Sequence, residues 1–177
     1  THDQVEAMTM ATRIAIMDAG VIQQFDTPDA VYDKPANLFV AGFIGAPAMN
    51  RINGRISRAN GHFTAMLEEP RIAVDLTGYA FEQAPKEGDE VVLGFRPEHF
   101  LPADANGATV AARFELPVQY TEKTGADATT YLKTNSGLLA VSVAPERSGA
   151  LKPGQKVPFG FPAEKLHVFD AGTGRRL

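Results

Sequence analysis

Histidine, serine and paired acidic residues are the side chains of this sequence that could act in catalysis or hold a metal. The four histidines are His2, His62, His99 and His167. No two of them lie three or four positions apart, as a metal site on one helix requires, and there is no cysteine to complete a zinc cluster. The serines lack the Gly-x-Ser-x-Gly pattern of a nucleophile elbow. These patterns argue against nucleophilic catalysis and against a local metal site. A metal site assembled from distant strands stays open.

The most distinctive chemical block is Gly-Phe-Arg-Pro-Glu-His at residues 94–99. Pro97 has no amide hydrogen, so a strand that passes through Phe95 must end or bulge there. Arg96 and Glu98 are two positions apart and can project from the same side of an extended segment. Two interpretations stay open: an ion-pairing cluster at an interface or ligand rim, and an ordinary solvated strand end.

Helix signals and one hairpin signal dominate the first 37 residues. Asp3 and Glu6 match a capping box, which predicts a helix over residues 4–12. Two β-rich runs around Asp-Ala-Gly at residues 18–20 predict a hairpin with glycine at a positive-φ corner. Thr-Pro at residues 27–28 then predicts the start of a second helix, with threonine as the cap.

Residues 39–50 join this part of the chain to one of a different character. Their aromatic and aliphatic residues predict a short apolar helix, which Gly45 and Pro47 end. We therefore expect a domain boundary near Gly45, with residues 1–45 before it and 46–177 after it. The alternative is a buried loop inside one domain.

The second part reads as short strands separated by Gly, Pro, Asn and Asp. The strands are expected at residues 51–56, 62–67, 71–76, 90–95, 108–114, 116–121, 129–134, 138–143, 156–161 and 165–169. Such a series is typical of an all-β barrel or sandwich. We prefer the barrel because it leaves no unpaired strand edges.

Composition limits the kinds of partner. The net charge is −4, and the basic residues form no stripe, which argues against nucleic acid as a partner. The longest apolar run, residues 38–48, is far shorter than the roughly 20 residues that cross a bilayer. No signal peptide pattern opens the sequence, so we expect a soluble chain or a soluble part of one.

A family resemblance rests on blocks of the first part: Thr-His-Asp-Gln-Val-Glu-Ala-Met at 1–8, Ile-Ala-Ile-Met-Asp-Ala-Gly at 14–20, and Gln-Gln-Phe-Asp-Thr-Pro at 23–28. These blocks resemble the end of the nucleotide-binding domain of an ABC transporter ATPase. The continuation through residues 32–45 is similar to the ATP-binding subunits of sugar importers of the maltose and glycerol-3-phosphate type. The resemblance implies that the first 45 residues are a short α/β remnant of that ATPase domain.

In that family, the histidine that matches His2 is the catalytic switch-loop residue that contacts the γ-phosphate of ATP. Such a donor stabilises charge on the transferring phosphoryl group. The sequence contains no Gly-Lys pair of a phosphate-binding loop and no Leu-Ser-Gly-Gly-Gln signature. The resemblance thus implies ATP and magnesium as cofactors of the intact parent protein, whereas we expect no ATP binding, no hydrolysis and no cofactor for this region alone.

The resemblance continues in residues 45–50, 93–99 and 161–170, which are similar to the transport-associated barrel of the same importers, an OB-type regulatory domain. Its implied function is regulation and pairing of two ATPase subunits, with membrane-spanning permease subunits and, in some members, a regulatory protein as further partners at the cytoplasmic face of the membrane. The pairing surface implied for this chain contains Ala48, Met49, Asn50, Arg96 and Glu98. A small-ligand or oxyanion-binding barrel is the alternative function.

Overall fold

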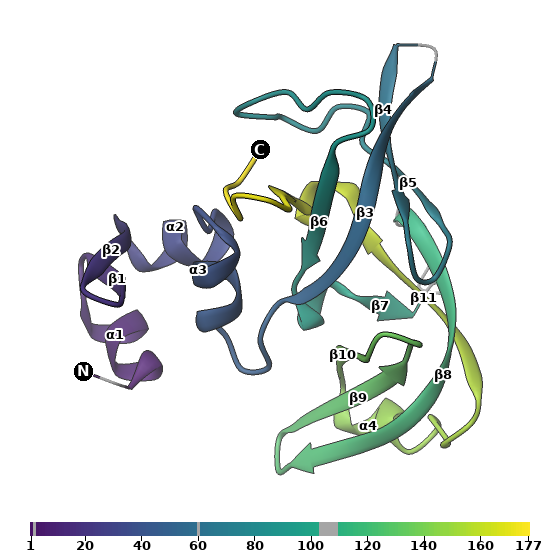
Figure 1. Cartoon of the computed structure of the whole chain (residues 1–177). Helices are drawn as coiled ribbons and strands as arrows, with labels where there is room; N and C mark the ends of the chain where they lie inside the picture. The colour runs from purple at the N-terminus through teal and green to yellow at the C-terminus, as the bar shows by residue number, and fades with distance from the viewer. Residues whose placement is uncertain (2, 60, 103–109) are drawn as a thin grey trace.

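The computed structural model describes residues 1, 3–59, 61–102 and 110–177, and it is mainly β. A small group of helices with one hairpin lies beside a larger β domain, and the chain end returns to the helices (Figure 1). The first group contains α1 Gln4–Met10, β1 Ile14–Asp18, β2 Val21–Asp26, α2 Pro28–Asp33 and α3 Leu38–Phe43. The helices and the hairpin predicted for this part are confirmed.

Of the capping box predicted at the start of α1, the part made by Asp3 is confirmed. The Asp3 carboxylate accepts from the amides of Val5 at 2.8 Å and Glu6 at 3.1 Å, as predicted. The Asp3 amide donates to the hydroxyl of Thr1 at 3.1 Å, however, so the predicted reach of the Glu6 side chain back to that amide is not observed. The helix also ends at Met10, two residues earlier than predicted.

The turn between β1 and β2 has two residues in the left-handed region. Gly20 has φ 81°, as the sequence predicts, and Ala19 has φ 46°. Positive φ at both central positions is the geometry of a type I′ hairpin turn, whose twist matches that of the strands. The sequence did not indicate an alanine in this role.

The β domain consists of two antiparallel five-stranded sheets. One has the order β12-β6-β3-β4-β5, and the other has the order β10-β9-β8-β11-β7. The first sheet contains β3 Asn50–Ala59, β4 His62–Leu67, β5 Ala73–Asp75, β6 Glu90–Phe95 and β12 His167–Asp170. The second contains β7 Leu101–Pro102, β8 Val110–Thr124, β9 Asp127–Lys133, β10 Leu138–Val143 and β11 Lys156–Pro162. Short helical turns are η1 Pro97–His99, α4 Pro145–Ser148 and η2 Ala163–Lys165.

The prediction of two separate strands in residues 108–121 was wrong. The runs expected at 108–114 and 116–121 form a single strand, β8, within the described residues, while 108 and 109 lie outside them. The strand changes partner along its length: it pairs with β11 as far as Pro117 and with β9 from Val118 onward. Alternating burial continues through Glu115, so nothing ends the strand there.

Five phenylalanine rings fill the space between the two sheets. They are Phe95, Phe100, Phe114, Phe159 and Phe161, and each is fully buried. Phe95 lies against Phe161 with ring centroids 4.5 Å apart, and Phe100 meets Phe114 edge-on at 5.4 Å. Apolar burial on this scale is the main stabilising term of the domain. These aromatics thus form the core of the β domain.

Asn50 joins the two sheets at one end. Its side-chain amide donates to the carbonyl of Ala140, and its side-chain oxygen accepts from the amide of the same residue, both at 2.7 Å. A side chain of β3 therefore pairs with the backbone of β10 in the way that another strand would. Within the described part of the chain, no helix is long and apolar enough to cross a membrane.

Candidate functional site: the junction between the two segments

Arg96 lies where the β domain meets the helices. The strand β6 ends at Phe95 because Pro97 cannot continue the ladder, and the chain turns into η1, as the sequence predicts. This turn sends the Arg96 side chain away from the sheet and toward α2 and α3. Although charged, the residue is only 1% exposed.

The guanidinium of Arg96 holds the ends of two helices. It donates to the carbonyl of Ile44, which follows α3, and at 2.8 Å to the carbonyl of Tyr32 in α2. The last carbonyls of a helix have no partner inside the helix and carry partial negative charge. A cation from the β domain therefore caps the end of α3 and also binds the end of α2.

Tyr32 completes this junction. Its ring lies under the Arg96 guanidinium, 4.0 Å from centroid to carbon, and its hydroxyl donates to the carboxylate of Glu98. Burial, followed by the hydrogen bond to Glu98, raises the pKa of Tyr32 to about 12, so the ring stays neutral. Burial also lowers the pKa of Arg96, yet an arginine keeps its charge at neutral pH. The result is a neutral aromatic face against a desolvated cation.

Gly45 leaves the room that Arg96 needs. Its φ is 110°, and a Cβ atom at this position would lie 2.9 Å from a guanidinium nitrogen of Arg96. Gly45 was predicted to lie just past a helix end, and the end of α3 at Phe43 confirms this. The contact with Arg96 gives this glycine a second role that the sequence did not indicate.

A second attachment holds the other end of α3. We call residues 171–177 the C-terminal strap; it follows β12 and runs back to the helices (Figure 1). The amide of Leu38 donates to the carbonyl of Gly174 at 2.8 Å, and the amide of Arg176 donates to the carbonyl of Ala36 at 3.0 Å. The helix α3 is therefore held at its start by the strap and at its end by Arg96.

Apolar packing also crosses the predicted boundary. Leu38 and Ala41 of α3 contact a small cluster in the β domain formed by Met49, Val92 and Phe169. Two further clusters lie wholly before residue 45 or wholly after residue 51. The boundary near Gly45 stays a prediction, but the contacts across it are polar at both ends of α3 and apolar between them.

The five residues expected on a pairing surface separate into two groups. Ala48 and Glu98 are exposed, whereas Met49, Asn50 and Arg96 are buried within the chain, at 3%, 6% and 1% exposure. The buried three contact α3, β10 and the helix ends, so any effect on a partner passes through those neighbours. The role of all five in pairing stays a prediction. His2 lies outside the described residues.

Two parts of the junction, Tyr32 and the strap, were not predicted from the sequence. Tyr32 was noted only within a block that resembles a family, and no spacing rule connects it to Arg96, 64 positions later. Among the described residues, no group of three His, Asp or Glu side chains could hold a metal ion. The polar chemistry of the junction therefore positions and fastens backbone elements.

Comparison with known proteins identifies the two parts of the β domain. Residues 45–100 match the family model described as the MalK OB fold domain, and residues 93–169 match the one described as the TOBE domain. In the solved structures, the cytoplasmic molybdate-binding protein ModG with molybdate bound has a TM-score of 0.52. It is 16% identical and covers 67% of this chain and 94% of its own. That likeness shows the fold alone.

The relatives that match this chain along nearly its whole length are named as transport proteins. The chain is 41% identical to the sn-glycerol-3-phosphate import ATP-binding protein UgpC of Burkholderia thailandensis, over 99% of this chain and 46% of that protein. It is 36% identical to the sulfoquinovosyl glycerol transport ATP-binding protein SmoE of Agrobacterium fabrum, over 100% and 47%. The lactose transport ATP-binding protein LacK of Rhizobium radiobacter is 38% identical, over 100% and 47%. The chain thus spans about half the length of these relatives. With both domain models matched, the chain belongs to the family of ATP-binding subunits of sugar and glycerol-3-phosphate ABC importers, and it carries the family's OB fold and TOBE region.

Proposed function

We propose that this chain acts as the C-terminal regulatory region of the ATP-binding subunit of an ABC importer for sugars or related solutes. The observation that carries the proposal is the attachment of α3, which is hydrogen-bonded to the strap at its start and to Arg96 at its end. These two attachments couple the helices to the β domain. A displacement of the β domain is thereby passed to the residues that resemble the ATPase domain.

In this proposal the β domain also pairs with a second copy of itself and keeps two ATPase subunits together. Ala48 and Glu98, both exposed, offer a direct contact surface. Sedimentation velocity tests this: the chain should form a dimer, and Ala48→Arg should weaken it. Ala84→Arg, which adds the same side chain at another exposed site, is the matched control. A chain that stays monomeric at high concentration would remove the pairing function.

The catalytic part of the proposal concerns the intact subunit. There, His2 would contact the γ-phosphate of ATP, magnesium would balance the phosphate charge, and permease subunits would hold the protein at the cytoplasmic face of the membrane. The relatives support this through their names, which describe import ATP-binding proteins. In the intact subunit, His2→Ala should abolish ATP hydrolysis while ATP binding persists. Calorimetry on residues 1–177 alone should detect no saturable ATP binding.

The oxyanion-binding alternative gains no support from ModG, because a likeness at 16% identity concerns the fold alone. A ligand that binds only the folded state must raise its apparent stability. Molybdate and sulfate should therefore leave the melting temperature of this chain unchanged. A saturable rise with either ion would favour the alternative.

A further inference from the structure

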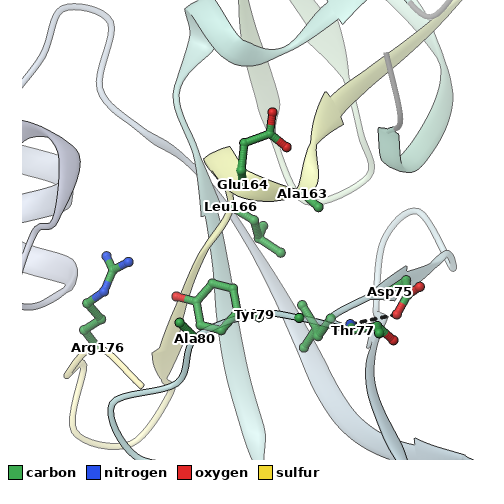
Figure 2. A pocket seen from close by; sticks show the side chains of 10 residues that line it. Asp75, Thr77, Tyr79, Ala80, Ala163, Glu164, Leu166 and Arg176 are labelled. Carbon is green, nitrogen blue, oxygen red and sulfur yellow. Dashed lines mark hydrogen bonds between the residues drawn. The ribbon is translucent and has the colours of Figure 1, made fainter. Parts of the chain in front are cut away.

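A cavity of about 390 Å³ lies on the β domain, between the turn that follows β5 and the segment around η2. Figure 2 shows Tyr79 between Arg176 on one side and Thr77 with Asp75 on the other, while Glu164 projects from η2. The buried side chains of Leu76 and Leu166 line it as well. The cavity thus combines apolar surface with charged and hydroxyl groups from three separate segments.

Hydrogen-bond donors are available on one side of the cavity. The Tyr79 hydroxyl accepts from the amide of Val168 at 3.0 Å, and its own proton has no acceptor within the part of the chain that the structure describes. One guanidinium nitrogen of Arg176 is 2.9 Å from Nδ1 of His167, and another is 3.8 Å from Glu82. A guanidinium has five N–H groups, so these contacts leave donors for a ligand.

Acceptors are supplied by two exposed carboxylates. Asp75 accepts from the amide of Thr77 at 2.8 Å through one oxygen. Glu164 has no hydrogen bond or ion pair within the described residues. Together they outweigh the single positive charge of Arg176, which also faces Glu82. The cavity is therefore unfavourable for an anion, although Arg176 alone would attract one.

We propose that this cavity binds a neutral polyhydroxyl molecule, such as a small sugar or polyol. A hydroxyl group both donates and accepts, so the hydroxyls of such a ligand suit a lining that offers donors and carboxylate acceptors together. The apolar patch of Leu76 and Leu166 suits the carbon face of such a ligand, and the volume is in the range of small-molecule sites. Because Arg176 belongs to the C-terminal strap, a bound ligand acts directly on the segment that holds α3.

Ligand-observed NMR on the whole chain tests this, with glycerol, sorbitol, D-glucose, D-galactose and lactose as neutral probes. Glycerol 3-phosphate and sulfate serve as anionic probes. At least one neutral probe should bind saturably, in roughly the millimolar range, and the anions should not. Glu164→Ala should weaken that binding about tenfold, and Tyr79→Phe should do the same. Tyr120→Phe, at an exposed tyrosine of β8 away from the cavity, is the matched control and should bind as wild type does.

Two outcomes would overturn the proposal. The cavity is not a binding site if no neutral probe binds the wild type, or if Glu164→Ala binds the probe as tightly as the wild type does. Glu164 is exposed and its replacement removes no buried contact, so this variant still tests the proposal if Tyr79→Phe unfolds. The ligand class is wrong if an anion binds more tightly. Sedimentation of the same samples measures pairing separately, so a chain that pairs without binding sugar contradicts this inference alone.

Discussion

The guanidinium of Arg96 lies over the ring of Tyr32, 4.0 Å from its centre, although 64 positions separate the two residues. One residue comes from the end of a β strand and the other from a short helix. The same guanidinium also donates to the carbonyls of Tyr32 and Ile44. One side chain therefore holds a ring and two helix ends together, at the opposite end of α3 from the strap.

Replacement of Arg96 by alanine should loosen the helices before it unfolds the β domain. The variant leaves the buried carbonyl of Ile44 and the partly buried carbonyl of Tyr32 without this donor, which costs about 2–4 kcal/mol. Hydrogen exchange reads the effect locally: the amides of Leu38–Phe43 should lose protection, and those of β6 and β8 should keep most of theirs.

Two controls sharpen this prediction. Arg96→Lys keeps a charge but loses the planar fork and the stacking on Tyr32, so it should recover only part of the lost protection. Arg55→Ala removes an exposed arginine that pairs with Glu90 at 2.7 Å, and it should cost at most about 1 kcal/mol. If Arg96→Ala and Arg55→Ala reduce stability and the protection of α3 equally, the contacts of Arg96 do not hold the helices to the β domain.

Asn50→Ala should separate the two sheets at their linked end. The substitution removes both hydrogen bonds to Ala140 and leaves a buried amide and a buried carbonyl unpaired, at a cost of about 2–4 kcal/mol. Urea denaturation measures the loss as a lower midpoint with an unchanged slope. Asn53→Ala, at an exposed position of the same strand, should change stability by about 0.5 kcal/mol at most.

Local elements of this fold could be predicted from the sequence because their causes are local. A cap such as Asp3, or a break at Pro97, depends on backbone groups within a few positions. The division of β8 was predicted wrongly because pairing partners decide it, and these come from β9 and β11, later in the chain. Arg96 and Glu98 were predicted at the end of a strand with two interpretations left open, but their common partner Tyr32 depends on how two segments pack.

Gly94→Ala should be destabilising because of Met49. A Cβ atom at Gly94 would lie 2.5 Å from the sulfur of Met49 and 3.1 Å from the Phe169 ring. Overpacking of this kind costs about 1–3 kcal/mol, part of which a flexible methionine can relieve. Thermal unfolding should show the loss, and the double variant with Met49→Ala should lose less than the two single losses added together.

Gly149→Ala is the matched control for that series. Gly149 has φ −66° and ψ −21°, a conformation that alanine adopts readily, and a Cβ atom there would meet nothing within 4 Å. This variant should be neutral or slightly stabilising, by up to about 1 kcal/mol. A comparable loss in both alanine variants would mean that the Met49 contact does not explain the effect at Gly94.

The strap should become weaker in acid because of His167. This histidine is 7% exposed, and its Nδ1 lies 2.9 Å from a guanidinium nitrogen of Arg176, so the ring must accept that hydrogen bond in its neutral form. Burial, followed by the charges of Arg176 and Arg96, lowers the pKa of His167 to about 3, from an ordinary value of 6.5. Between pH 6.5 and about 3, His167 is therefore protonated in the unfolded chain and neutral in the folded chain.

The sign of the pH dependence follows from this difference. Above pH 6.5 the stabilisation is fully present, and it is lost progressively as the pH falls toward 3, at up to about 1.4 kcal/mol per pH unit. His167→Gln keeps an oxygen that can accept from Arg176 but cannot titrate. Between pH 6.5 and 4, the wild type should therefore lose up to about 3 kcal/mol more stability than this variant. Urea midpoints across that range measure the difference, with His62→Gln at an exposed position as the control. If wild type and His167→Gln keep a constant difference across the range, the buried histidine is not the acid-sensitive group of the strap.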